Sequence, residues 1–127
     1  MRRATLGDEH VDRAIAATND FNREFQDLIT RYAWGTIWTR PELDVRTRRL
    51  LALATLAALG RWEEFAMHIR SGLNRELEPS DLKELLLQTA IYAGVPAANT
   101  GFQIAQKILE SAEIQPPEQP DNETLAT

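Results

Sequence analysis

The sequence predicts an all-α protein, a compact domain of about six helices with no sheet. Three observations favour this class: apolar residues recur at helical spacing, capping residues and glycines punctuate the chain, and no segment alternates as a strand does. The chain has 127 residues, of which 43% are hydrophobic and 26% charged, as is ordinary for one globular domain. We therefore expect a single helical domain over residues 1–113.

The N-terminal third of the chain predicts two helices. The first covers residues 7–18, with Asp8 as a possible N-cap. The second covers residues 19–34, where phenylalanine, leucine and tyrosine recur at helical steps. We expect helical order to fail in the segment 35–43, because it contains a glycine and a proline.

Four further helices fill the rest of the domain. The first of them, residues 45–59, should begin at an Asp44 cap and end at Gly60. The others cover residues 61–75, residues 80–93 with Pro79 in the first turn, and residues 96–112. The second half of the helix at 45–59 is apolar on every side, which predicts either the centre of the fold or a subunit interface.

The ends of the chain and its longest apolar run indicate where in the cell the protein is expected. Residues 114–127 are polar and proline-rich, which predicts a disordered tail. The run Leu50–Leu59 is about half the ~20 residues that span a bilayer, and the N-terminus lacks the apolar core of a secretory signal. We expect a cytoplasmic protein with no membrane partner.

Charge and cysteine content exclude several classes of function. The formal net charge of −5 disfavours nonspecific binding to nucleic acid, so we expect no nucleic-acid partner. The absence of cysteine excludes disulfides, thiolate zinc sites, iron–sulfur clusters and thiol nucleophiles. The two histidines lie far apart in sequence and do not specify a metal site, so we expect no metal.

The segment "RWEEFAMHIR" carries the first candidate site. Arg61, Glu64 and His68 follow one another at steps of three and four, which places them on one face of a helix. One interpretation is an exposed stripe with a modest pair between Glu64 and His68. The other is an acid–base site, in which Glu64 orients His68 or raises its pKa so that it donates a proton near neutral pH.

Arginines and a few pocket candidates form the second set. Arg46 and Arg49 stand at the N-terminal end of a helix, where cations oppose the macrodipole, so an anionic partner would explain them. Together with Arg40 they are candidate carboxylate binders, and solvated flanking charge is the alternative. Trp38, Tyr92 and Asn99 are weaker candidates for lining a pocket.

Three segments in this order resemble the γ-carboxymuconolactone decarboxylases, over about residues 2–113. They are "RRATLGDEHVDRA", the stretch from "ITRYAWGTIWTRPEL" to "LGRWEEFAMHI", and "LLLQTAIYAGVPAAN". The broader fold also hosts alkylhydroperoxidase D and related thiol peroxidases, which carry CxxC on the corresponding helix and a histidine four residues later. Counting back from His68, those two positions hold Arg61 and Glu64, so the resemblance implies an active-site wall without the redox pair.

The resemblance implies a reaction as well as a fold. The family's substrate is an unsaturated lactone with two carboxylates, which loses its ring carboxylate as CO2 while the electron pair moves through the ring double bond to the lactone carbonyl. The substrate is its own electron sink, so no metal or organic cofactor is expected. The product is an enol lactone on the route from protocatechuate to 3-oxoadipate.

On this basis each candidate takes a role. The arginines, Arg61 included, would bind carboxylates or the enolate, and His68 would donate a proton with Glu64 orienting it. Members of the fold assemble as trimers or hexamers, so a homo-oligomer is expected. The alternatives are a relative acting on another small carboxylated lactone or keto acid, or a non-catalytic helical oligomer.

Overall fold

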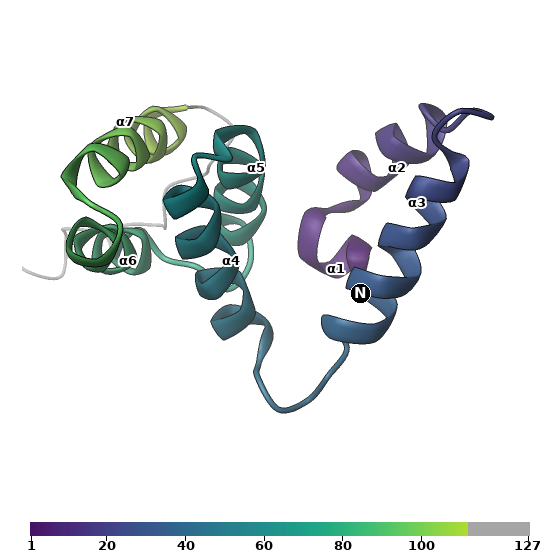
Figure 1. The fold of residues 1–127 in the computed structure, drawn as a ribbon, viewed down its shortest axis with the longest axis horizontal. Helices are drawn as coiled ribbons and strands as arrows, with labels where there is room; N and C mark the ends of the chain where they lie inside the picture. The colour runs from purple at the N-terminus through teal and green to yellow at the C-terminus, as the bar shows by residue number, and fades with distance from the viewer. Residues whose placement is uncertain (112–127) are drawn as a thin grey trace, which may run out of the picture.

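The computed structural model describes residues 1–111, and within them the chain is helical with no strand (Figure 1). The described part contains seven α-helices and one π-helix, so the all-α prediction is confirmed. The elements are α1 (Arg2–Leu6), α2 (Asp8–Ala16), α3 (Arg23–Ile29), η1 (Thr30–Ile37), α4 (Val45–Leu59), α5 (Trp62–Leu73), α6 (Pro79–Tyr92) and α7 (Val95–Glu110).

The N-terminal third differs from the prediction in two ways. A short additional helix, α1, ends at Gly7, whose φ of 92° lies in the left-handed region that glycine adopts readily. Asp8 is therefore the first residue of α2, and its side chain makes no capping hydrogen bond. Helical order also continues through Gly35, because η1 closes wider turns in which the backbone N–H of Trp38 donates to the Ala33 carbonyl at 2.9 Å.

The predicted boundaries around α4 and α6 are confirmed. Asp44 caps α4, where its Oδ1 accepts a hydrogen bond from the backbone N–H of Thr47 at 2.7 Å. Gly60 ends the same helix with a φ of 71°, as a left-handed C-terminal residue does. Pro79 lies in the first turn of α6, where its missing N–H costs no hydrogen bond.

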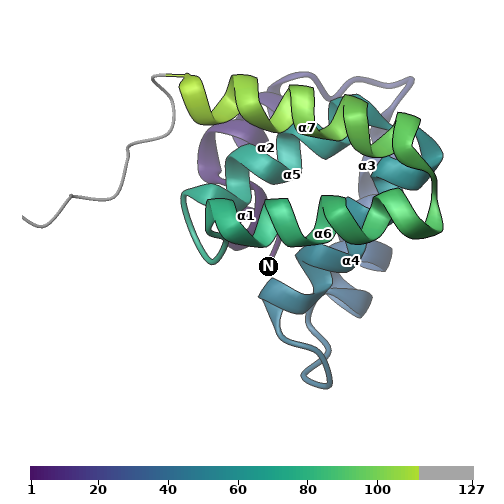
Figure 2. The same cartoon turned by 90° about the vertical axis from the view of Figure 1, so that its left-hand side faces the viewer.

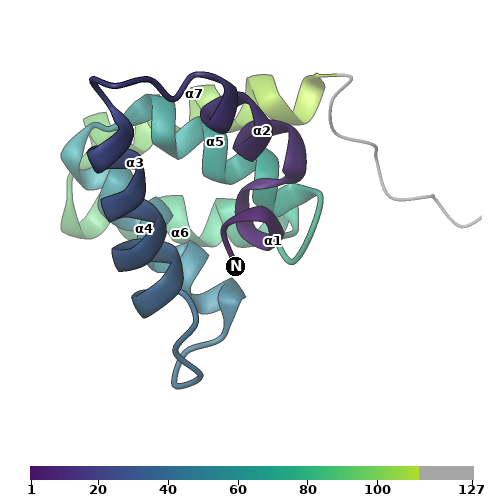
Figure 3. The same ribbon diagram turned by 90° about the vertical axis from the view of Figure 1, so that its right-hand side faces the viewer.

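Helices α4 to α7 surround the main core, and α6 and α7 form a hairpin on one side of it (Figure 2). The buried side chains of this core are Leu53, Ala57, Phe65, Ile69, Leu77, Leu82, Leu86, Ala105 and Ile108. Helices α1 to α3 and η1 lie on the opposite side (Figure 3) and form a second, smaller core. Leu6, Val11 and Trp34 are buried there, and Met67 of α5 packs against them.

The prediction that α4 lies at the centre of the fold is confirmed for one side of the helix, and the alternative of a subunit interface stays a prediction. Leu53 and Ala57 are fully buried in the main core, whereas Leu51 and Leu59 on the other side of the helix are 54% and 65% exposed. The helix therefore belongs to the core and also presents an apolar surface, because one chain covers only one of its sides.

Two further predictions concern the chain ends and the membrane. The end of the domain at residue 113 and the tail at 114–127 lie outside the described residues. Within residues 1–111, each helix is too short or too polar to cross a membrane.

Candidate active site

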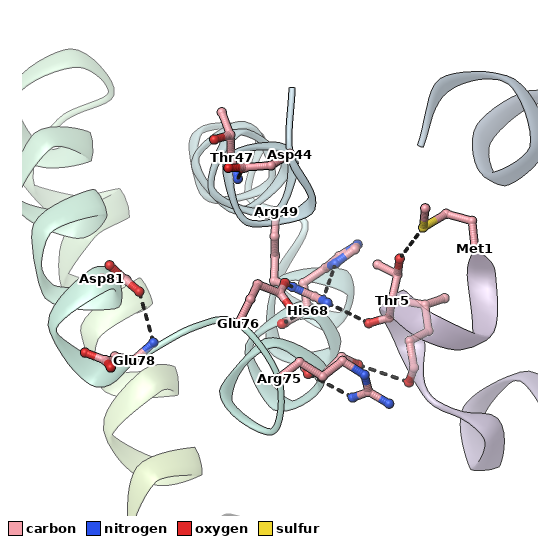
Figure 4. Close-up of polar contacts among 12 residues, drawn as sticks. Met1, Thr5, Asp44, Thr47, Arg49, His68, Arg75, Glu76, Glu78 and Asp81 are labelled. Carbon is pink, nitrogen blue, oxygen red and sulfur yellow. Dashed lines mark hydrogen bonds and ion pairs between the residues drawn. The ribbon is translucent and has the colours of Figure 1, made fainter. Parts of the chain in front are cut away.

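Arg49 of α4 is fully buried, and its guanidinium joins three segments of the chain (Figure 4). Its Nη2 donates to the Thr5 carbonyl oxygen of α1 at 2.7 Å, and its Nη1 donates to the His68 carbonyl oxygen of α5 at 3.3 Å. Its Nε forms an ion pair with Glu76, in the turn between α5 and α6. The Arg49 guanidinium thus finds its hydrogen-bond and ion-pair partners inside the protein and does not reach the surface.

The His68 side chain lies beside this guanidinium and is only 7% exposed. Nη1 of Arg49 is 3.4 Å from Nδ1 of the imidazole. Since a guanidinium can only donate, this contact is a hydrogen bond in the tautomer that carries the ring hydrogen on Nε2 and leaves Nδ1 as the acceptor. The indole ring of Trp38 stacks on the imidazole, with ring centroids 5.9 Å apart and planes 9° from parallel.

This environment keeps His68 neutral. Burial is the main cause that lowers its pKa from 6.5 to about 4, and the positive charges of Arg49 and His10 add to it. The prediction that Glu64 raises the pKa of His68 is therefore wrong. Glu64 itself lies exposed on the surface of α5.

An open pocket of about 800 Å³ lies between α2 and α5, and His68 is not among the residues that line it. Met67, which precedes His68, and Glu64, one turn earlier, both line it. Its other charged and polar lining includes His10 and Arg13 of α2, with Arg70, Ser71 and Arg75 at the end of α5 and beyond. Four carboxylates, Asp8, Glu9, Glu63 and Glu64, share this lining with three arginines.

His10 is the residue that sequence reasoning set aside. The chain's two histidines are far apart in sequence, but the structure brings His10 close enough for its charge to lower the pKa of His68. Its own pKa is lowered by burial and by the neighbouring charges of Arg2 and Arg13. The signal available in the sequence was its place inside "RRATLGDEHVDRA", the first segment of the family resemblance.

The three predicted carboxylate-binding arginines do not converge. Arg49 is buried, whereas Arg46 forms an ion pair with Asp81 and lines a second pocket of about 600 Å³ between α4 and α6. Arg40 lies exposed in the loop after η1, 3.8 Å from Glu42. The anionic partners that were expected for these arginines from their positions in the sequence are thus carboxylates of the same chain.

The remaining candidates lie at the surface. Tyr92 is 84% exposed and lines the second pocket with Arg46. Arg61, at the start of α5, and Asn99 of α7 are exposed. The structure therefore brings together Trp38, Arg49 and His68, whereas the other predicted residues are exposed at the surface. Within residues 1–111, no group of three or more His, Cys, Asp or Glu side chains is placed to hold a metal ion.

These features define a helical domain with a buried arginine–histidine pair and an open polar pocket between α2 and α5. Residues 23–107 match the model of the carboxymuconolactone decarboxylase family, and the chain belongs to this family.

The chain is similar to three decarboxylases. It is 42% identical over 116 residues to a 4-carboxymuconolactone decarboxylase of Acinetobacter baylyi, covering 91% of this chain and 87% of the relative. It is 35% identical over 109 residues to a nitrosuccinic acid decarboxylase of Metarhizium robertsii, covering 86% and 76%. It is 63% identical over 35 residues to a 4-carboxymuconolactone decarboxylase of Pseudomonas putida, covering 28% and 73%.

Proposed function

We propose that this protein decarboxylates 4-carboxymuconolactone to 3-oxoadipate enol-lactone, in the cytoplasm and as a step of protocatechuate degradation. The observation that carries the proposal is the 42% identity to the Acinetobacter baylyi enzyme, which extends over 91% of this chain and 87% of the relative. A match of that length includes the segments that supply Trp38, Arg49 and His68, since only 11 residues of the 127 lie outside it.

The decarboxylation requires little of the protein beyond binding of the substrate and stabilisation of the charge that develops on it. When the carboxylate leaves as CO2, the electron pair of the broken bond moves through the ring double bond to the lactone carbonyl oxygen. The ring therefore holds the electrons itself, and the proposal includes no metal or organic cofactor. The protein must hold the dianion, stabilise the developing enolate and allow one proton to reach carbon.

The pocket between α2 and α5 is the proposed substrate site, because it is open to solvent and is lined by Met67, the residue that precedes His68 in α5. Arg75 is well placed for a substrate carboxylate. Its Nη1 donates to the Ser71 carbonyl oxygen at 2.9 Å, which fixes the side chain on the pocket wall, and the other donors of the guanidinium fork suit a carboxylate.

We also propose that copies of this chain associate. An apolar stripe at helical spacing begins at Phe21 in the turn before α3 and continues along α3 and η1 with Phe25, Leu28 and Tyr32, and these side chains are 57% to 97% exposed. Side chains of this size are seldom left open to water in such a row. The resemblance gives three or six as the number of copies.

Light scattering of the wild type and of Phe25→Glu tests whether copies of the chain associate. Association should be lost in the variant, and a monomeric wild type would refute the proposal.

Nitrosuccinic acid is the second candidate substrate, because a relative of this chain is named for its decarboxylation. It also carries two carboxylates beside a group that accepts electrons, here the nitro group. The experiment is a comparison of kcat/KM for the two acids with the purified protein. We expect a large preference for 4-carboxymuconolactone, and a preference for nitrosuccinate would replace the proposed function by the second one.

A further inference from the structure

The contact between Arg49 and His68 leaves one ring nitrogen of the histidine for chemistry. Nδ1 faces the guanidinium at 3.4 Å, and the ring lies flat against Trp38. Among the described residues, Nε2 has no hydrogen-bond partner, and His68 as a whole residue is 7% exposed. The Nε2–H is therefore the one polar group that this imidazole can offer to a ligand.

We propose that Arg49 is a positioning residue that holds His68 as the neutral Nε2–H tautomer, and that this N–H donates a hydrogen bond to the lactone carbonyl oxygen during decarboxylation. The inference rests on the proposed function and changes the role of His68 within it. The histidine stabilises the developing enolate and keeps its proton throughout the reaction.

The contacts of Arg49 explain why it can fix the ring. Its Nη1 is shared between the carbonyl oxygen and Nδ1 of His68, so the same group contacts both the backbone and the ring of one residue. Nη2 and Nε are held by Thr5 and Glu76, which leaves the guanidinium no freedom to turn. A buried guanidinium whose nitrogens are all hydrogen-bonded can hold the side chain of a second residue in one orientation.

The balance of the step does not require His68 to give up a proton. The bond between the ring carbon and the carboxylate breaks, CO2 leaves, and the electron pair moves to the carbonyl oxygen. The enolate returns its electrons to carbon, which takes up one proton that comes from solvent water. A neutral imidazole is suited to this task, because its N–H can stabilise an oxyanion without competing to protonate it.

Two substitutions of His68 distinguish its role as a hydrogen-bond donor from a role as a proton donor. Glutamine offers a neutral N–H near the place of Nε2 and cannot act as an acid, whereas alanine offers neither. We expect His68→Ala to lose about 10²–10³-fold in kcat, as loss of one oxyanion donor does, and His68→Gln to recover at least about tenfold of that loss. Equal losses in the two variants would overturn the role of His68 as a hydrogen-bond donor.

The role of Arg49 is tested by Arg49→Lys, with Arg48→Lys as the matched control. Arg48 is the neighbouring arginine of α4 and donates to the Arg40 carbonyl oxygen at 3.3 Å, away from His68. We expect kcat to fall at least about tenfold in Arg49→Lys with KM within about twofold, and both constants to stay unchanged in Arg48→Lys. An Arg49→Lys variant that folds and keeps its kcat would overturn the role of Arg49.

A spectroscopic measurement is independent of turnover. In protein labelled with ¹⁵N-histidine, two-bond correlations between ring nitrogens and carbon-bound protons identify the tautomer, and His68→Gln assigns the signals. We expect the Nε2–H form in the wild type near neutral pH and a mixture of tautomers in Arg49→Lys. A wild-type spectrum with the hydrogen on Nδ1, or on both nitrogens, would overturn the proposal. If the wild type showed the expected tautomer but no turnover of either acid, the proposed function would fail while the Arg49–His68 assignment held.

Discussion

The rings of Trp38 and His68 lie nearly parallel, with centroids 5.9 Å apart and planes 9° from parallel. Trp38 follows the π-helix η1, and His68 lies near the middle of α5, so the stacked pair joins the N-terminal helices to the main core. The wider turns of η1 extend the helix as far as Ile37 and thereby place the indole against the imidazole. The pair thus connects an unusual backbone feature to the environment of the candidate catalytic ring.

The first prediction concerns this stacking. Trp38→Ala should raise the pKa of His68 from about 4 toward its ordinary value of 6.5, because removal of the indole lets water reach the ring. Trp38→Phe keeps an aromatic face and should leave the pKa near about 4. The proton NMR titration of the His68 ring gives both values. A pKa that stays low in Trp38→Ala would show that the Arg49 charge, and not burial beneath Trp38, is the main cause.

The second prediction is a pH dependence of stability. His68 is a base with a lowered pKa in the folded state, so between about pH 6.5 and about pH 4 the unfolded chain binds a proton that the folded chain does not. The free energy of unfolding should therefore fall by about 2–3 kcal/mol as the pH drops through this window, and level off below it.

Urea denaturation across this range measures that effect. His68→Gln should lose most of the pH dependence, while the smaller contribution of His10, whose pKa is also lowered, remains in both proteins. An unchanged slope in His68→Gln would contradict the assignment of the effect to His68.

The third prediction uses two buried glycines of the main core. A Cβ at Gly72 would lie 2.5 Å from Cδ of Arg49, and a Cβ at Gly101 would lie 2.5 Å from a methyl group of Leu86. Both alanine variants should lose about 1–3 kcal/mol of stability by overpacking. Only Gly72→Ala displaces Arg49, so it alone should also lower kcat. Thermal denaturation and steady-state kinetics on the two variants provide the comparison, and equal kcat values would count against the Arg49–His68 link.

The fourth prediction distinguishes the two pockets. Arg75→Gln should raise KM for 4-carboxymuconolactone about tenfold or more, because it removes a charged donor from the pocket between α2 and α5. Arg46→Gln changes the pocket between α4 and α6 and should leave KM within about twofold. Steady-state kinetics on the two variants would refute this assignment if their effects on KM were reversed.

The helices were the most predictable part of the fold. Asp44, Gly60 and Pro79 act locally, through capping and backbone conformation, so their neighbours in sequence suffice to place the ends of α4 and the start of α6. The continuation of the helix through Gly35 was not predictable in this way. There the packing of Trp34 against Leu6 and Val11 stabilises η1, and such contacts are absent from a local pattern.

The candidate site was only partly predictable. His68 was identified from the sequence, but its protonation was predicted with the wrong sign, because Glu64 is close in sequence while the burial and the Arg49 charge come from the fold. Arg49 was expected to bind an anion, with a substrate carboxylate as the candidate. Its partner is Glu76, a residue 27 positions later, and no sequence spacing distinguishes such an internal partner from a substrate.

The central claim is the decarboxylation itself, and the most direct measurement is the simultaneous recording of CO2 release and ultraviolet absorbance with freshly prepared 4-carboxymuconolactone and a metal chelator. The account predicts one CO2 per lactone consumed, at a rate far above the reaction without protein and unaffected by the chelator. A folded protein that leaves the lactone unchanged, or consumes it without releasing CO2, would contradict it.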